Sequence, residues 1–250
     1  MAGHSQYANI KHRKERVDAA RGKLWTKLSK AIIVAAKMGG GDPDANSRLR
    51  AAIVAAKAVS LPNANIERAI KTGTGELEGG DVEEILYEGY GPGGVAVLCE
   101  IATDNRNRTA GEIRKIFDNH GGQLGKLGCV AWMFERKGLF AIPADKVNED
   151  QVMDIVLEAG ADDMKREGEN FEVLCSPDQF TAVGEALDKA QIPTTVRQVS
   201  RIANNMVDLD ADTARTVVKL MQALDDHDDV QNVFANFNLP DEVAAELAAG

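Results

Sequence analysis

Three cysteines, few aromatic residues and no long apolar run set the first limits on what this sequence can encode. Cys99, Cys129 and Cys175 are widely spaced, which gives neither a disulfide framework nor a paired zinc motif and is typical of a reducing cytosol. Aromatic residues make up 5% of the chain, so aliphatic residues and alanine must fill the core. No apolar run has the length of a membrane span or a signal peptide. We therefore expect a cytoplasmic protein with no membrane partner.

Groups with the spacing of an active site are also scarce. The four histidines are scattered, and none lies near a cysteine or a second histidine at metal-ligand spacing. The acidic run of Asp225, Asp226, Asp228 and Asp229 is more typical of a solvated helix end than of a metal site. We therefore predict a protein that is not an enzyme, with no cofactor, no metal and no small-molecule substrate.

Two glycine motifs could still indicate chemistry. Gly89, Gly91 and Gly94 have the spacing of a dinucleotide fingerprint, but a strand follows them instead of a helix, which favours a hairpin turn. The tripeptide at 121–123, Gly-Gly-Gln, is the one that release factors use for peptidyl-tRNA hydrolysis. It stands without a supporting motif, and glycine pairs commonly end helices. A hydrolase acting through Gln123 is therefore the minor alternative.

Charge is distributed very unevenly along the chain. Residues 1–75 contain 14 of the 29 basic residues and 5 of the 39 acidic residues, a net charge of +9. Residues 76–250 hold the remainder, with a net charge of −19. A basic head on an acidic body is typical of a protein that binds a polyanion through one part of its structure.

The basic head divides into an arm, 1–15, and an amphipathic helix from Arg16. Leu24, Leu28 and Ile32 fall on one side of that helix, and lysines at seven-residue spacing fall on the other. We expect the basic side to meet phosphates, and binding to fall steeply with salt because counterions are released. The alternative is a merely solvated face. The candidate nucleic-acid-binding residues are Lys11, Arg13, Lys14, Arg16, Arg21, Lys23, Lys27, Lys30 and Lys37.

Arg106 and Arg108 form a second candidate contact, for which pairing with the acidic body is the alternative. For the helix, we expect that reversing Lys23, Lys27 and Lys30 to glutamate abolishes nucleic-acid binding while the fold survives.

Periodicity predicts an α+β fold, with an N-terminal three-helix domain followed by two ferredoxin-like modules. Asn46 or Ser47 caps the second helix, Asn63 or Asn65 starts the third, and Thr109 with Glu112 forms a capping box for a later helix. The chain after residue 238 is expected to be a loose tail. The predicted strands are 84–88, 95–101, 130–135 and 139–142 (a hairpin), 171–174, 195–202 and 230–237.

Several long motifs resemble the YebC family of probable transcriptional regulators, whose mitochondrial members are translational activators. The resemblance runs from residue 1 to about residue 237 and is strongest at the start. The matching segments are 2–5 (AGHS), 8–14 (ANIKHRK), 48–50 (RLR), 65–70 (NIERAI), 87–94 (YEGYGPGG), 103–109 (TDNRNRT) and 131–134 (AWMF).

The resemblance implies three domains, with the last inserted into the middle one, a cytoplasmic location and no cofactor. The implied boundaries are 1–78, then 79–134 with 205–238, then 135–204, and a tail at 239–250. The chain departs from the family pattern at Gln6-Tyr7, Gln123 and Cys129. The first departure removes one charge from the arm, and the other two weaken the release-factor interpretation.

Two functions follow as hypotheses. One is a DNA-binding transcriptional regulator that acts through the basic N-terminal domain. The other is a translational activator that contacts ribosomal RNA on the ribosome. No helix-turn-helix with a clear base-reading helix is visible in the sequence, which favours RNA.

Overall fold

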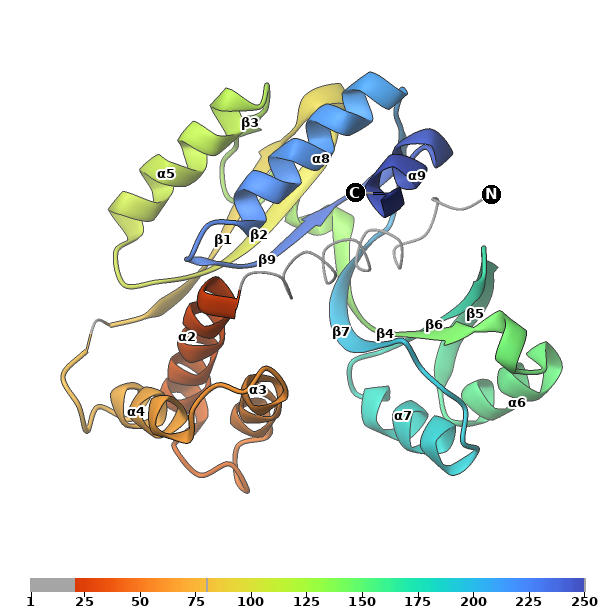
Figure 1. Ribbon diagram of the computed structural model, residues 1–250, viewed down its shortest axis with the longest axis horizontal. Coiled ribbons are helices and arrows are strands. Elements are labelled where there is room, and N and C mark those ends of the chain that lie inside the picture. Colours follow the sequence, from red (N-terminus) through yellow and green to blue (C-terminus); the bar gives the residue numbers. More distant parts are fainter. Residues whose placement is uncertain (1–20, 80, 250) are drawn as a thin grey trace. The chain divides into compact units, whose positions relative to one another are not determined.

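The computed structural model describes residues 21–79 and 81–249 of the chain. These residues form two compact units, one from residues 21–131 and 216–235, the other from 132–215 and 236–249. The predicted α+β class is confirmed, because helices come first and two four-stranded antiparallel sheets follow (Figure 1). No helix in the described ranges is long and apolar enough to cross a membrane. The finer domain boundaries given above stay a prediction.

The first unit begins with three packed helices, α2 (Arg21–Gly39), α3 (Ser47–Ala58) and α4 (Asn63–Gly73). Each contributes one apolar face to a shared core, as the period of 3.6 residues predicts. The buried members of this core are Ile32, Ala35, Ala36, Leu49, Ala56, Leu61, Ile66 and Ala69.

Polar contacts fix how these helices meet. Asn46 is the N-cap of α3: its side chain accepts from the Leu49 N–H at 3.0 Å and donates to the Ala35 carbonyl at 2.8 Å. A Cβ at Gly73 would lie 2.4 Å from the Ile33 carbonyl oxygen, so only glycine lets α4 approach α2 this closely.

A four-stranded sheet completes the first unit, in the order β3, β1, β2, β9. Its strands are β1 (Glu83–Tyr90), β2 (Ala96–Thr103), β3 (Gln123–Leu124) and β9 (Val230–Ala235). Phe117 of α5 (Arg106–Asn119) and Leu220 of α8 (Ala211–Asp225) lie beside Gly89 and Gly91, so both helices cover one face (Figure 1). On the other face, Val34 of α2 packs with Val82 and Ala102.

Two details of this unit bear on the predictions. β1 and β2 are joined by the short helix Pro92–Gly94, so Gly89, Gly91 and Gly94 form a hairpin connection as predicted. The predicted capping box at Thr109 is wrong, because α5 begins at Arg106 and Asn105 is its cap, accepting from the Arg108 N–H. Thr109 is a buried residue of the first helical turn.

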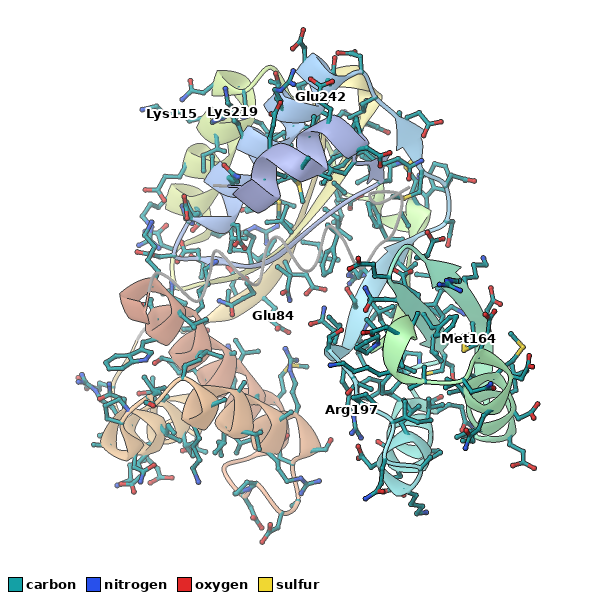
Figure 2. All side chains as sticks on the ribbon, turned by 45° about the vertical axis from the view of Figure 1, so that its right-hand side comes forward. Glu84, Lys115, Met164, Arg197, Lys219 and Glu242 are labelled. Carbon is teal, nitrogen blue, oxygen red and sulfur yellow. The ribbon has the colours of Figure 1, made fainter. Side chains whose placement is uncertain are left out.

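The second unit contains a βαββαβ module of ferredoxin type, with strands in the order β5, β6, β4, β7. Both helices pack on one face of the sheet around a core that includes Phe140, Val156 and Leu187. Arg197 of β7 lies over the Phe140 ring near α7 (Figure 2). The elements are β4 (Phe134–Pro143), α6 (Glu149–Glu158), β5 (Ala161–Glu167), β6 (Asn170–Cys175), α7 (Phe180–Lys189) and β7 (Val196–Ala203).

Two expectations for the second unit are wrong, and one of its strands was not predicted. The predicted hairpin over 130–142 is a short helix, Ala131–Met133, followed by the single strand β4. β5 was not predicted because its charged, weakly alternating sequence has little apolar signal. The expected loose tail contains helix α9 (Asp241–Ala249), which Arg215 holds through Glu242 and Glu246. The short strands β8 (Val207–Asp208) and β10 (Phe237–Asn238) pair in parallel.

Candidate nucleic-acid interface

The predicted basic residues divide into those the structure describes and those it does not. Lys11, Arg13, Lys14 and Arg16 lie outside the described residues. Arg21 is the first residue of α2. The structure therefore bears on the lysines of α2 and on the two arginines of α5.

Three lysines on one face of α2, here called the lysine row, meet a single acidic segment at residues 225–229. Lys23 Nζ donates to the Asp226 carbonyl at 3.1 Å. Lys27 Nζ donates to the Asp225 carbonyl and lies 3.5 Å from the Asp225 carboxylate. Lys30 forms an ion pair with Asp229. The acidic segment therefore covers part of the predicted basic face: Lys27 is only 7% exposed, whereas Lys23 is exposed.

This geometry also changes what a charge reversal would measure. A glutamate at position 27 would stand beside the Asp225 carboxylate in a buried place, where like charges repel strongly. The expectation that reversing the row leaves the fold intact is therefore not supported.

The acidic segment is likewise not a solvated helix end. Asp225 and Asp229 are buried, whereas Asp226 and Asp228 are exposed. The segment connects the end of α8 to the start of β9, so its backbone is held on both sides by regular structure. It presents carbonyl and carboxylate oxygens along one side of α2.

Asp229 connects the segment to several other elements through its carboxylate. Its carboxylate accepts from Thr109 at 2.6 Å, from Arg108 at 2.8 Å and from Thr103 at 3.3 Å, besides pairing with Lys30. Burial by itself would raise the pKa of Asp229, but the hydrogen bonds from Lys30, Thr109 and Arg108 lower it well below its usual range. Asp229 is therefore a fixed negative charge that joins α2, β2 and α5.

The two arginines of α5 behave differently. Arg108 pairs with Asp229 and with Asp104, so the alternative of pairing with the acidic body is the one observed. Arg106 is exposed. Its backbone carbonyl accepts from the Tyr87 hydroxyl at 3.3 Å, and its guanidinium partly opposes the rise in the Tyr87 pKa that burial causes. Both arginines are exposed, and Arg106 is the one whose side chain forms no ion pair with the other described residues.

Further bases of the helical region pair with acids at the start of β1. Lys37 pairs with Asp81, and Arg48 pairs with Glu84, which Figure 2 labels on β1. All four side chains are substantially exposed. These ion pairs are therefore weak contacts that other ions can replace.

A second set of bases faces solvent on α3 and α4, and we call Lys57, Arg68 and Lys71 the open cations. All three are exposed, and within the described ranges none has a side-chain ion pair. Arg68 and Lys71 are three residues apart and so share one face of α4. None of the three was among the residues predicted from the sequence, although each lies on the polar side of a short amphipathic helix.

α3 and α4 also have a feature of helix-turn-helix proteins. Four residues connect them, and Ser60 in this connection has φ +60°. Two helices joined by such a turn occur in DNA-binding motifs, where the N-terminal residues of the second helix reach base edges. The exposed residues Asn63, Asn65 and Arg68 have this position on α4. The expectation that no helix here clearly reads bases stays a prediction, because helix geometry alone does not show base contact.

One group of residues has the composition of a metal site. Glu112, His227 and Asp229 bring one ligand atom each to within 4.8 Å of one another. However, the Asp229 carboxylate already accepts from two cations, and His227 Nδ1 accepts the Asp229 N–H at 3.1 Å. His227 Nε2 then carries the proton toward Glu112, 2.9 Å away. This donor set is better suited to hydrogen bonding than to a metal ion.

The tripeptide at 121–123 lies where a helix changes into a strand. Gly121 has φ +71° and follows the C-cap residue His120, and Gln123 begins β3 opposite Tyr90. The loop after β3 is anchored by the buried Glu88 carboxylate, which accepts N–H groups from Gly128, Val130 and Ala131; the N–H···O distances are 2.6, 2.7 and 2.7 Å. The tripeptide thus has a clear local structural role.

The comparisons with known proteins cover nearly the whole chain. The family profile described as "TACO1/YebC protein N-terminal domain" matches residues 5–76, and "TACO1/YebC second and third domain" matches residues 82–237. A protein of Rhodopirellula baltica named "Probable transcriptional regulatory protein" is 58% identical over 98% of this chain and its own full length. A protein of Natranaerobius thermophilus with the same description is 54% identical, over 97% of this chain and 98% of its own.

A solved structure is also similar. The crystal structure of a conserved hypothetical protein from Aquifex aeolicus has a TM-score of 0.79 and 47% sequence identity, covering 91% of this chain and 94% of that one. With both family profiles matched in order and relatives similar along their full length, the chain belongs to the TACO1/YebC family.

Proposed function

We propose that this protein is a non-enzymatic, DNA-binding regulator of transcription that acts through its N-terminal helical region, residues 1–78. The single observation that carries the proposal is the set of open cations on α3 and α4, two helices joined by a four-residue turn. The relatives named probable transcriptional regulatory proteins support the same reading.

The mechanism begins with phosphate contacts. Lys57, Arg68 and Lys71 neutralise phosphates and release counterions, which supplies affinity without sequence information. The start of α4 then lies nearest the bases, where Asn63 and Asn65 could read an adenine edge and Arg68 a guanine edge. The arm residues, with Arg106, add further phosphate contacts.

The test is binding of a fluorescent 20-base-pair duplex, measured by anisotropy from 50 to 300 mM salt. The logarithm of the binding constant should fall linearly with the logarithm of salt, with a slope of about −0.9 per phosphate contact. A triple variant Asn63→Ala, Asn65→Ala, Arg68→Ala should lose discrimination between a selected site and random DNA. Binding that does not change with salt would contradict the proposal.

A second candidate is a translational activator bound to ribosomal RNA. One observation favours it. The ammonium groups of Lys57 and Lys71 and the guanidinium group of Arg68 all suit phosphate oxygens, whereas α4 offers three candidate base-reading residues. Folded RNA is recognised largely by shape and backbone, which needs few base readers. Sucrose-gradient fractionation of lysate with and without RNase separates the two: co-migration with ribosomes selects translation, and association with nucleoid DNA selects transcription.

A further inference from the structure

The lysine row of α2 contacts the acidic segment at regular intervals along the helix. Lys23, Lys27 and Lys30 follow one another at spacings of four and three residues, and each ammonium meets oxygen atoms of the acidic segment. Successive oxygens placed along one helix face resemble the phosphate oxygens along a nucleic-acid strand. A lysine ammonium donates to either kind of oxygen, because it is a compact charge with three rotatable donors.

Among the described residues, a small apolar cluster and several polar contacts join α2 to the sheet. The apolar cluster there consists of Val34, Val82 and Ala102, with Ile33 partly buried beside it. Ion pairs and hydrogen bonds from lysine and arginine also join the helical region to the rest of the unit. The exposed pairs of Lys37 and Arg48 weaken with salt and exchange readily with other anions. The buried contacts of Lys27 and Lys30 are screened much less, so only an anion that supplies oxygens to the whole row can replace them.

The connection to the sheet would allow α2 to leave the segment. The chain between α4 and β1 contains Gly75 and Gly79, and Gly75 already has φ +82°. The acidic segment itself is held in place, because Asp229 is bonded to Thr103, Arg108 and Thr109. Separation would therefore move the helical region and leave the segment on its own sheet.

We infer that the lysine row is a second nucleic-acid-binding surface, and that the acidic segment occupies it as an internal substitute for the phosphate backbone. Nucleic acid competes with the segment for Lys23, Lys27 and Lys30, so the segment restrains binding until a polyanion replaces it. This inference rests on the proposed function and adds its regulation. Lys23 is the exposed end of the row and is the first position that a phosphate reaches.

The test compares duplex binding by the full chain and by two variants of equal charge. Asp225→Asn, Asp226→Asn and Asp228→Asn remove three charges beside the row and leave Asp229 in place. The matched control, Asp145→Asn, Glu149→Gln and Asp150→Asn, removes three charges from the second unit. We expect the first variant to bind at least tenfold more tightly than the control at 50 mM salt. Equal affinity of the two variants would overturn the inference, as would weaker binding by the first.

A distance measurement gives a second readout that does not depend on whether the triple asparagine variant of the acidic segment folds. Spin labels at Val54→Cys and Lys115→Cys, both at exposed positions, report the separation of α3 and α5 in a chain carrying Cys129→Ser. Saturating duplex should shift the distance distribution, whereas an unchanged distribution with bound duplex would overturn the inference alone. If neither the wild type nor any variant binds duplex or RNA at low salt, the proposed function fails and the inference fails with it.

Discussion

The cations of α2 and those of α3 and α4 belong to one small helical bundle, yet their surroundings are opposite. Lys27 and Lys30 meet carboxylates with little exposure, while Lys57, Arg68 and Lys71 face solvent. Both sets come from the same basic head and have the same sequence signature of bases on the polar side of a helix. The difference shows that a cationic helix face identifies attraction to anions but does not identify which anion is bound.

The largest expected effect is on stability and concerns the buried contacts between α2 and Asp229. Asp229→Ala should lower the free energy of unfolding by about 3 kcal/mol, because two cations and two hydroxyl groups lose a buried acceptor. Urea denaturation at pH 7 measures the change. Asp228→Ala is the control at an exposed neighbour and should change it by no more than about 0.5 kcal/mol. Equal losses would mean that burial does not distinguish these acids.

For the open cations of α3 and α4, we expect substitutions to change binding and not stability. Reversing Lys57, Arg68 and Lys71 to glutamate should weaken duplex binding about 100-fold at 50 mM salt, or about 2.7 kcal/mol. The urea midpoint should stay nearly unchanged, because the three side chains are exposed. The control reverses Lys146, Lys189 and Lys219, which changes net charge equally. A similar loss in the control would show that only total charge matters.

Acid should remove the contribution of Asp229 in a defined range. The folded-state pKa of Asp229 is lowered, so its stabilisation is present above the unfolded value of about 3.9 and declines below it. Between pH 4.5 and pH 3, the stability difference between wild type and Asp229→Asn should shrink by about 1 kcal/mol. Paired urea titrations across this range provide the measurement. A difference independent of pH would show that the carboxylate is not the source.

The smallest effect concerns the exposed ion pair of Arg48 with Glu84. Arg48→Ala should cost about 0 to 1 kcal/mol, since both side chains remain largely in water and salt screens the pair. The loss should disappear at 1 M salt. A larger loss that persists in high salt would place Arg48 with the buried contacts of α2.

Much of the local structure follows directly from sequence. The amphipathic period of α2 and the cap at Asn46 depend on residues within a few positions of one another, and both are as predicted. Local signals failed where distant residues decide. The strand β4 is one piece because it pairs with both β6 and β7, which lie far along the chain. Likewise, Arg215 pairs with Glu242 and Glu246 of α9, which lie 27 and 31 positions later in the chain.

Sequence by itself determined that this protein has a basic helical head on an acidic α+β body, and that Lys23, Lys27 and Lys30 share one helix face. Charge and periodicity are properties of the chain, so composition and spacing are sufficient for these conclusions. Only the tertiary structure decided that these lysines meet residues 225–229, some 200 positions later, while Lys57, Arg68 and Lys71 stay open. A lysine attracts any nearby negative charge, and the packing of the whole unit determines which negative charge lies near it.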